Sequence, residues 1–169
     1  LWWGDGFTEW TNLVRGSPRF VGHVQPKVPR DLGFYDLTNE RIIHRQVELA
    51  QKMGLFGFCF YYYNFDGKRL LEKPLDLFVK TNKARFPFCL MWANENWTRR
   101  WDGMENDVLI AQTYNQLDEF ALVADLAAYM ADDAYYKIDG RPLLFCYRAD
   151  IIPNCASVLA RWRKIFSSR

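Results

Sequence analysis

Residues 86–92 read F-P-F-C-L-M-W, a strand-length run with no charged residue. Two further runs have the same character, L-F-G-F-C-F-Y at 55–61 and P-L-L-F-C-Y at 142–147. None of the three alternates polar with apolar residues, which is typical of strands buried on both faces of a parallel sheet. We therefore expect three such strands, in a sheet covered by helices.

Segments with helical periodicity lie between these runs. Residues 39–53 place Ile43, Val47 and Ala50 on one stripe, and Gly54 follows as a natural stop. Similar spacing recurs in three later segments, which start near residues 71, 115 and 153. The alternation of helix and strand predicts an α/β fold with a parallel sheet.

Two stretches carry no such periodicity. About the first 35 residues mix Gly, Pro, Trp and charged residues, and residues 93–112 form a second irregular stretch with a short extended piece expected at 108–110. The first of these stretches is too long for an ordinary connection. Asp139-Gly140, by contrast, indicates a simple tight turn before the third strand.

Length, composition and charge narrow the class of protein. The chain has 169 residues, which suits one domain, and half of them are hydrophobic, which excludes a disordered chain, a collagen-like repeat and a coiled coil. Its 22 basic and 20 acidic residues leave a net charge of +2, so we expect no nucleic-acid partner. Aromatic residues make up 17% of the chain, an excess that requires a structural or functional explanation.

The four cysteines form no metal or disulfide pattern. Cys59, Cys89 and Cys146 each lie in an apolar run, and no pair has C-x-x-C spacing. We expect neither structural zinc nor a disulfide framework, and we favour a reducing, cytoplasmic compartment. The longest apolar stretch, residues 55–63, is too short to cross a bilayer. Because the chain begins with Leu1, we expect it to be a piece of a longer protein, and the question of a signal peptide stays open.

The sharpest group of polar and aromatic residues follows the second run. Loops at the carboxyl ends of parallel strands build active sites in α/β folds. There, amide and carboxylate groups would bind sugar hydroxyls, while indoles would pack against the C–H faces of a sugar. The candidate substrate-binding residues here are Trp92, Asn94, Glu95, Asn96, Trp97 and Trp101. The competing interpretation places Trp92 and Trp97 in the core, with Asn94 and Asn96 capping a turn.

A second candidate group opens the chain and contains Trp2, Trp3, Asp5, Glu9, Trp10 and Asn12. These residues would either form another active-site loop or plug the mouth of a barrel, with Glu9 solvated. From this group we count Glu9 and Trp10 as candidate substrate-binding residues. Tyr62 and Tyr63, after the first run, join them, although one of two adjacent tyrosines should point into packing.

Motifs for cofactors and covalent catalysis are missing from the sequence. It contains no G-x-G-x-x-G, no G-x-x-x-x-G-K, no G-x-S-x-G and no metal-spaced pair of histidines, so we expect no cofactor and no metal. For Arg99 and Arg100, binding of phosphate or carboxylate competes with ion pairing to Asp102 or Glu105. We favour ion pairing for at least one of the two.

Four motifs together resemble the WbsX family. They are W-W-G-D-G-F-T-E-W-T-N at 2–12, D-L-G-F-Y-D-L at 31–37, G-F-C-F-Y-Y-Y at 57–63 and W-A-N-E-N-W-T-R-R-W-D-G at 92–103. The family comprises glycosyltransferase-like proteins of lipopolysaccharide O-antigen biosynthesis and is grouped with family 99-like glycoside hydrolases. The resemblance extends over nearly the whole chain.

What the resemblance implies is a (β/α)8 barrel (a TIM barrel) that acts on glycans. Such barrels usually have about 250 residues, so residues 1–169 would form a single incomplete barrel domain that runs from helix 1 through helix 4. The first strand and the C-terminal half would then lie outside the chain.

The resemblance also bears on catalysis. Family members carry a glutamate pair in a later W-N-E-W-x-E-G-like segment, which this sequence lacks, so we expect the fragment alone to be inactive. The catalytic residues therefore remain unknown. Glu95 is a possible substitute, but the resemblance supports it as a residue that lines the site.

We carry two functional hypotheses forward. The first is a fragment of a carbohydrate-active enzyme, a glycosyltransferase or a glycoside hydrolase, whose partners are a glycan or a sugar donor and acceptor and the missing half of the barrel. The second is a non-catalytic carbohydrate-binding domain that uses the same aromatic and polar surface. A purely structural α/β domain would instead require the W-A-N-E-N-W side chains to be buried and mutually satisfied.

Overall fold

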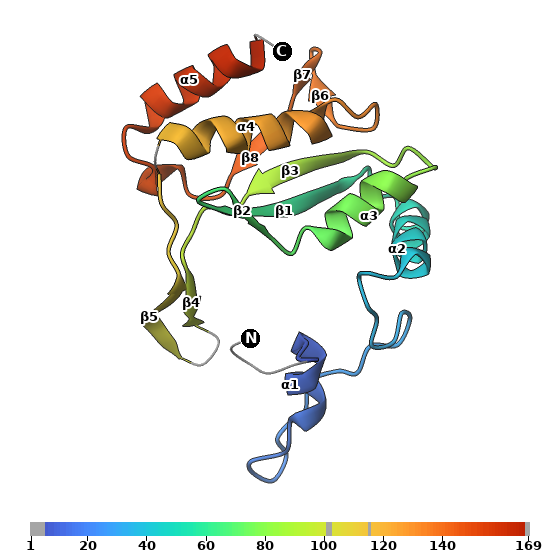
Figure 1. Cartoon of the computed structure of the whole chain (residues 1–169). Helices are drawn as coiled ribbons and strands as arrows, with labels where there is room; N and C mark the ends of the chain where they lie inside the picture. The colour runs from blue at the N-terminus through green and yellow to red at the C-terminus, as the bar shows by residue number, and fades with distance from the viewer. Residues whose placement is uncertain (1–5, 101–102, 115, 168–169) are drawn as a thin grey trace.

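A computed structural model describes residues 6–100, 103–114 and 116–167 of the chain (Figure 1). Its elements are α1 (Glu9–Arg15), α2 (Glu40–Lys52), β1 (Phe58–Phe65), β2 (Lys68–Leu70), α3 (Lys73–Thr81), β3 (Phe88–Trp92), β4 (Trp97–Arg99), β5 (Met104–Ile110), α4 (Gln116–Met130), β6 (Lys137–Ile138), β7 (Arg141–Pro142), β8 (Leu144–Cys146), the 3-10 helix η2 (Ala149–Ile151) and α5 (Cys155–Ser167). No helix in these ranges is long and apolar enough to cross a membrane.

The three apolar runs form the parallel part of one sheet, as predicted. The strand order is β2-β1-β3-β8, where β1, β3 and β8 are parallel and β2 is antiparallel to β1. The register aligns Tyr62 of β1 with Trp92 of β3, and Trp92 with Cys146 of β8. The carboxyl ends of the three strands therefore meet at one edge.

The strands begin two or three residues later than their apolar runs, and a close approach of two backbones explains where β1 starts. The amide of Phe58 donates to the carbonyl of Pro87 at 2.9 Å. A Cβ on Gly57 would lie 2.4 Å from that carbonyl oxygen, so only glycine fits before the first rung of the β1–β3 ladder.

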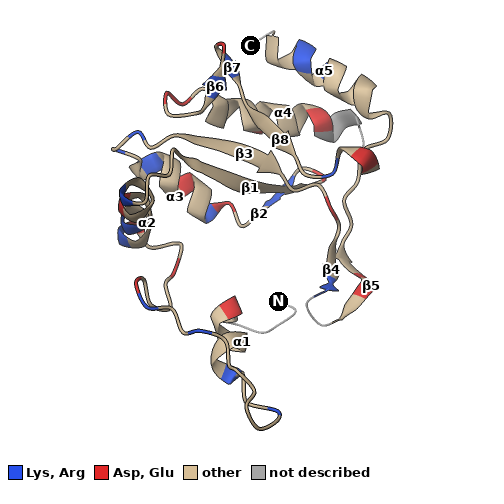
Figure 2. Ribbon diagram, turned by 180° about the vertical axis from the view of Figure 1, so that it is seen from behind, with Lys and Arg blue, Asp and Glu red and all other residues tan. Residues whose placement is uncertain are grey.

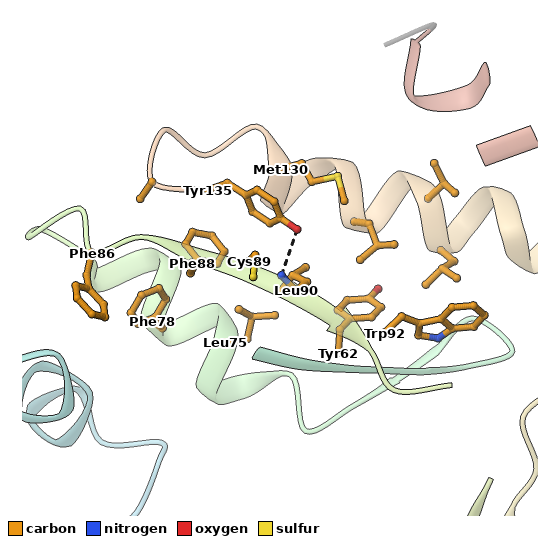
Figure 3. Close-up of a cluster of buried hydrophobic side chains, with 14 of the residues drawn as sticks. Tyr62, Leu75, Phe78, Phe86, Phe88, Cys89, Leu90, Trp92, Met130 and Tyr135 are labelled. Carbon is orange, nitrogen blue, oxygen red and sulfur yellow. Dashed lines mark hydrogen bonds between the residues drawn. The ribbon is translucent and has the colours of Figure 1, made fainter. Parts of the chain in front are cut away.

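One face of the sheet packs against helices and forms the core; we call it the covered face. Phe88 and Leu90 of β3 are 1% and 0% exposed. Figure 3 shows Phe88 between Phe78 of α3 and Tyr135, which follows α4, with Leu90 further along β3. The Tyr135 hydroxyl accepts from the Leu90 amide at 3.2 Å and donates to a carbonyl before β8, so it also ties the strands together.

The opposite face, which we call the open face, corrects one expectation. Tyr61 of β1 and Phe145 of β8 are 55% and 44% exposed, and Tyr147, just beyond β8, is 49% exposed. The prediction of burial on both faces is therefore wrong for β1 and β8 within the described ranges. In both Figures 1 and 2, α1 and the β4–β5 hairpin lie on the side of the sheet away from α4 and α5.

The predicted helices and the tight turn are confirmed. Asn39 caps α2, because its side chain accepts from the Arg41 amide at 3.0 Å, and the helix buries the predicted stripe. Asp139 and Gly140 both have positive φ, 51° and 74°, as a two-residue turn between β6 and β7 requires. Helix α1 and the full β4–β5 hairpin were not predicted, since both lie in the stretches that lack periodicity.

Candidate functional site

The residues that follow β1, β3 and β8 lie together at the carboxyl edge of the sheet. Figure 2 shows the three strands without charged residues, and acidic and basic segments where β3 and β8 end. The segments concerned are 63–66, 93–97 and 147–150. This is the edge at which α/β proteins place their binding sites.

Asn94 joins two of these strand ends and is fully buried, at 0% exposure. Its side-chain amide donates to the carbonyl of Arg148 at 2.7 Å, and its side-chain oxygen accepts from the Arg148 amide at 2.8 Å. The Tyr147 amide donates to the carbonyl of Trp92 at 3.0 Å, so the Asn94 side chain adds a further rung to the β3–β8 ladder. Tyr114 closes this arrangement, because its hydroxyl donates to the Asn94 carbonyl at 2.9 Å.

This rung brings Arg148 next to Glu95. One guanidinium nitrogen donates to Glu95 Oε1 at 2.9 Å, and the other two donate to the two oxygens of Asp150 at 2.7 and 2.6 Å. The bonds from Arg148 lower the pKa of Asp150, and those carboxylates in turn raise the pKa of Arg148, Asp150 more than Glu95. Two carboxylates thus share one guanidinium, and the cluster carries one net negative charge.

Aromatic rings extend the site along the open face. The ring of Trp97 meets Tyr63 edge-on at 5.2 Å and Phe65 at 5.5 Å. Tyr61 lies 6.1 Å from Tyr63 and 6.2 Å from Tyr147, measured between ring centroids. We call Tyr61, Tyr63, Trp97 and Tyr147 the aromatic wall. Half-burial raises the pKa of Tyr63, with smaller contributions from Tyr61 and Glu9.

Two predicted site residues lie on the covered face. Trp92 is 3% exposed, and its ring packs 6.0 Å from Tyr114 and 5.2 Å from Trp162 of α5. Tyr62 is 1% exposed, and its hydroxyl donates to Asp125 of α4. Neighbouring strand residues point to opposite faces, so Tyr63 lies on the open side and Tyr62 does not. The core interpretation therefore fits the rings of both Trp92 and Tyr62.

The other candidates have separate surroundings. Asn96 is exposed, and its side chain accepts from the Gln112 amide at 2.7 Å, which closes the base of the hairpin. Trp10 donates through its indole to the carbonyl of Tyr35 at 3.0 Å. Trp101, Trp2, Trp3 and Asp5 lie outside the described residues.

The expectation for the two hairpin arginines is confirmed. Arg100 pairs with Glu105 at 3.2 Å, and Arg99 pairs with Asp107 at 3.6 Å. Within the described ranges, no group of His, Cys, Asp and Glu side chains could hold a metal ion.

Sequence reasoning had not selected Arg148, Asp150 or Tyr114 as functional residues. The available signal for Arg148 and Asp150 is their place directly after the third predicted strand, where a parallel sheet exposes its loops. Tyr114 lies on the connection between β5 and α4, where its sequence surroundings give no comparable signal.

The fold is similar to that of a protein described as glycoside hydrolase-like. A solved structure of that description superimposes with a TM-score of 0.58 and 17% sequence identity, over 94% of this chain and 53% of the other. At this level of identity the likeness concerns the fold. The chain belongs to the glycosyltransferase WbsX family, whose model matches residues 1–169. The resemblance in the sequence motifs is thereby confirmed.

Close relatives share the same region. The uncharacterized protein WxcX of Xanthomonas campestris pv. campestris, from two strains, is 49% identical over 162 residues. The matching region is 96% of this chain and 23% of WxcX, so the chain spans less than a quarter of these relatives.

Proposed function

We propose that this chain belongs to a carbohydrate-active enzyme and supplies one wall of its sugar site. The observation that carries the proposal is Glu95, held by Arg148 beside the aromatic wall at the carboxyl edge of the sheet. A sugar needs hydrogen-bond acceptors for its hydroxyls and flat apolar faces for its C–H groups. The family and the fold both support a glycan as the substrate class.

Glu95 would act as a ligand for sugar hydroxyls. A carboxylate has about four acceptor positions, and Arg148 uses one of them, while the Glu95 side chain is 37% exposed. Asp150 is a poor proton donor near neutral pH, because Arg148 lowers the pKa of its carboxyl. Glycoside hydrolysis requires a carboxyl pair with one protonated member, so the catalytic pair would come from outside this cluster.

The open face supports a barrel as the complete fold. Sheets of parallel strands are normally buried on both faces, and in a barrel the inward side chains of neighbouring strands pack against one another. In this proposal β1, β3 and β8 are adjacent barrel strands, and α2, α3, α4 and α5 belong to the outer ring. Residues 1–169 are then one incomplete domain whose partner is the remainder of the barrel.

We also propose a place for the protein in polysaccharide synthesis in the cytoplasm. The family resemblance implies lipopolysaccharide or O-antigen assembly. The four free cysteines, of which Cys59 and Cys89 face each other across β1 and β3, suit a reducing compartment.

The Glu95→Gln variant of the full-length protein tests this proposal. Gln keeps the shape and loses the charge, and hydrogen bonds to charged groups contribute about 1.5–3 kcal/mol, so glycan affinity or turnover should fall about 10- to 100-fold. Glu105→Gln is the matched control, because Glu105 pairs with Arg100 out on the hairpin. Unchanged glycan binding and turnover in Glu95→Gln would exclude Glu95 from the site.

A non-catalytic carbohydrate-binding domain is the second candidate. It is favoured by the cluster itself, since Glu95 and Asp150 bind the same guanidinium and neither is placed as a free acid. In that case the full-length protein would bind glycans through the aromatic wall without cleaving or extending them. Product analysis after incubation with bound glycans separates the two functions.

A further inference from the structure

A small cavity lies on the covered face, behind the end of β3. It has a volume of about 20 Å³ and lies between the ends of β1 and β3, the connection from β5 to α4, and helices α4 and α5. Its apolar lining is Leu122 and Val158, and its polar lining, besides Tyr114, is Asn64, Asp66, Trp92, Gln112, Thr113, Glu119 and Trp162. Tyr114 also lines the cavity, and its hydroxyl is hydrogen-bonded to Asn94, the residue before Glu95.

Three buried polar atoms around this cavity lack partners among the residues that the structure describes. They are the indole nitrogens of Trp92 and Trp162 and the side-chain oxygen of Gln112. Both tryptophans are 3% exposed, so bulk solvent does not reach their N–H groups. A buried polar group without a partner costs about 1–3 kcal/mol, which makes three of them around one cavity a strong indication of a bound group.

We propose that this cavity is a binding site for a single O–H group. A hydroxyl oxygen accepts two hydrogen bonds and donates one, which matches two indole donors and one amide acceptor. The space also fits, because a water molecule needs a cavity of at least about 10–15 Å³. The O–H group comes either from one trapped water molecule or from a hydroxyl of a bound polyol.

The site has a consequence for the neighbouring loop. The backbone amide of Gln112 donates to Asn96, two residues beyond Asn94. An O–H group bound to the Gln112 side chain would therefore connect helix α5, through Trp162, with the loop that carries Glu95. Gln112 and Trp162 are positioning residues in this scheme, and the O–H group is the link between them.

Crystals of the full-length protein test the proposal, grown without polyols and then soaked in glycerol. We expect one density peak within hydrogen-bonding distance of both indole nitrogens and of Gln112 Oε1. A peak of one atom before and after the soak identifies water, and density that extends from the peak only after the soak identifies a polyol. Contact of either indole nitrogen with a protein carbonyl, or a cavity without density, overturns the proposal.

Variants add an independent measurement in solution. Trp162→Phe keeps an aromatic ring and removes one donor, so the density peak should be lost and the ultraviolet resonance Raman band that reports indole hydrogen bonding should shift for Trp92. Trp10→Phe is the matched control, because Trp10 donates to a protein carbonyl and should leave the peak in place. Gln112→Met, on the half-buried connection before α4, repeats the test if Trp162→Phe does not fold. Retention of the peak in both Trp162→Phe and Gln112→Met contradicts the proposal.

Discussion

The covered and the open faces of the central sheet carry the same kinds of residue in opposite surroundings. Phe88 and Leu90 lie under helices and are 1% and 0% exposed, whereas Tyr61 and Phe145 are 55% and 44% exposed. All four belong to apolar runs without alternation, so composition does not separate the two faces. The comparison teaches that a run of apolar residues predicts a strand but does not predict which of its two faces is buried under helices.

The largest expected effect comes from truncation on the covered face. Leu90→Ala should lower the free energy of unfolding by about 2–5 kcal/mol, because it leaves a cavity among packed rings. In residues 1–169 on their own, Phe145→Ala on the open face should cost much less, since Phe145 is 44% exposed there. Chemical denaturation of the two variants measures both values. Equal losses in residues 1–169 would mean that the open face is buried there too, for example by self-association of the chain.

A second effect concerns the Asn94 side chain, whose two hydrogen bonds to the backbone of Arg148 extend the β3–β8 ladder. Asn94→Ala leaves the amide and the carbonyl of Arg148 without their side-chain partner, which should cost about 2–4 kcal/mol and weaken glycan binding together with stability. Asn96→Ala removes one hydrogen bond from an exposed position and should cost below about 1 kcal/mol. Thermal melts together with glycan titrations follow both properties. Normal stability in Asn94→Ala would show that the rung is dispensable.

The smallest effect is a pH dependence from the border of the covered face. Burial and then a hydrogen bond to Asp76 raise the pKa of Tyr129 to about 12, from an ordinary value of 10.0. The folded protein therefore holds this proton more tightly, so the contribution to stability is present below pH 10 and is lost as the pH rises through 12. Because Tyr129 is only half-buried at the border of the sheet, solvent screens the interaction with Asp76 and the effect should stay below about 1 kcal/mol.

Denaturation midpoints between about pH 9 and 12 measure this loss. The decrease of the denaturation midpoint with rising pH should be smaller in Tyr129→Phe than in the wild type. Tyr147→Phe, on the open face, serves as the control and should decrease as the wild type does. Buried Tyr62 and Tyr135, whose pKa values burial also raises, add to the loss in every variant. Identical slopes in Tyr129→Phe and the wild type would contradict the assignment.

Much of the fold could be predicted from the sequence, for reasons that are local. A pattern of a few neighbouring residues is enough to predict each of these elements. They are the three strands of the apolar runs, the helix with the stripe of Ile43, Val47 and Ala50, and the Asp139-Gly140 turn. The phase of the strands could not be predicted, because aromatic residues occupy successive positions of β1. Tyr62 and Trp92 were therefore selected as sugar-binding residues and lie in the core.

The candidate site was predicted in part for a different reason. Asn94 and Glu95 could be selected because one short motif combines them with several aromatic and polar residues. Their partner Arg148, however, lies more than fifty residues away in sequence. Only the β3–β8 pairing brings the two segments together. The role of Asn94 as a substitute for a backbone rung is likewise a property of the folded sheet, and the motif alone suggests a sugar ligand or a turn cap instead.

The contact between Gly57 and Pro87 has a consequence at the far end of the sheet. Since no side chain fits at position 57, a substitution there would push the first rung apart or move β1 by one residue along β3. A slip of one residue exchanges the two faces of a strand, which would turn Tyr61 and Tyr63 inward and Tyr62 outward. The absence of a Cβ at position 57 therefore helps to fix the register that places Tyr61 and Tyr63 on the open face, and a substitution there would alter a surface that Gly57 does not contact.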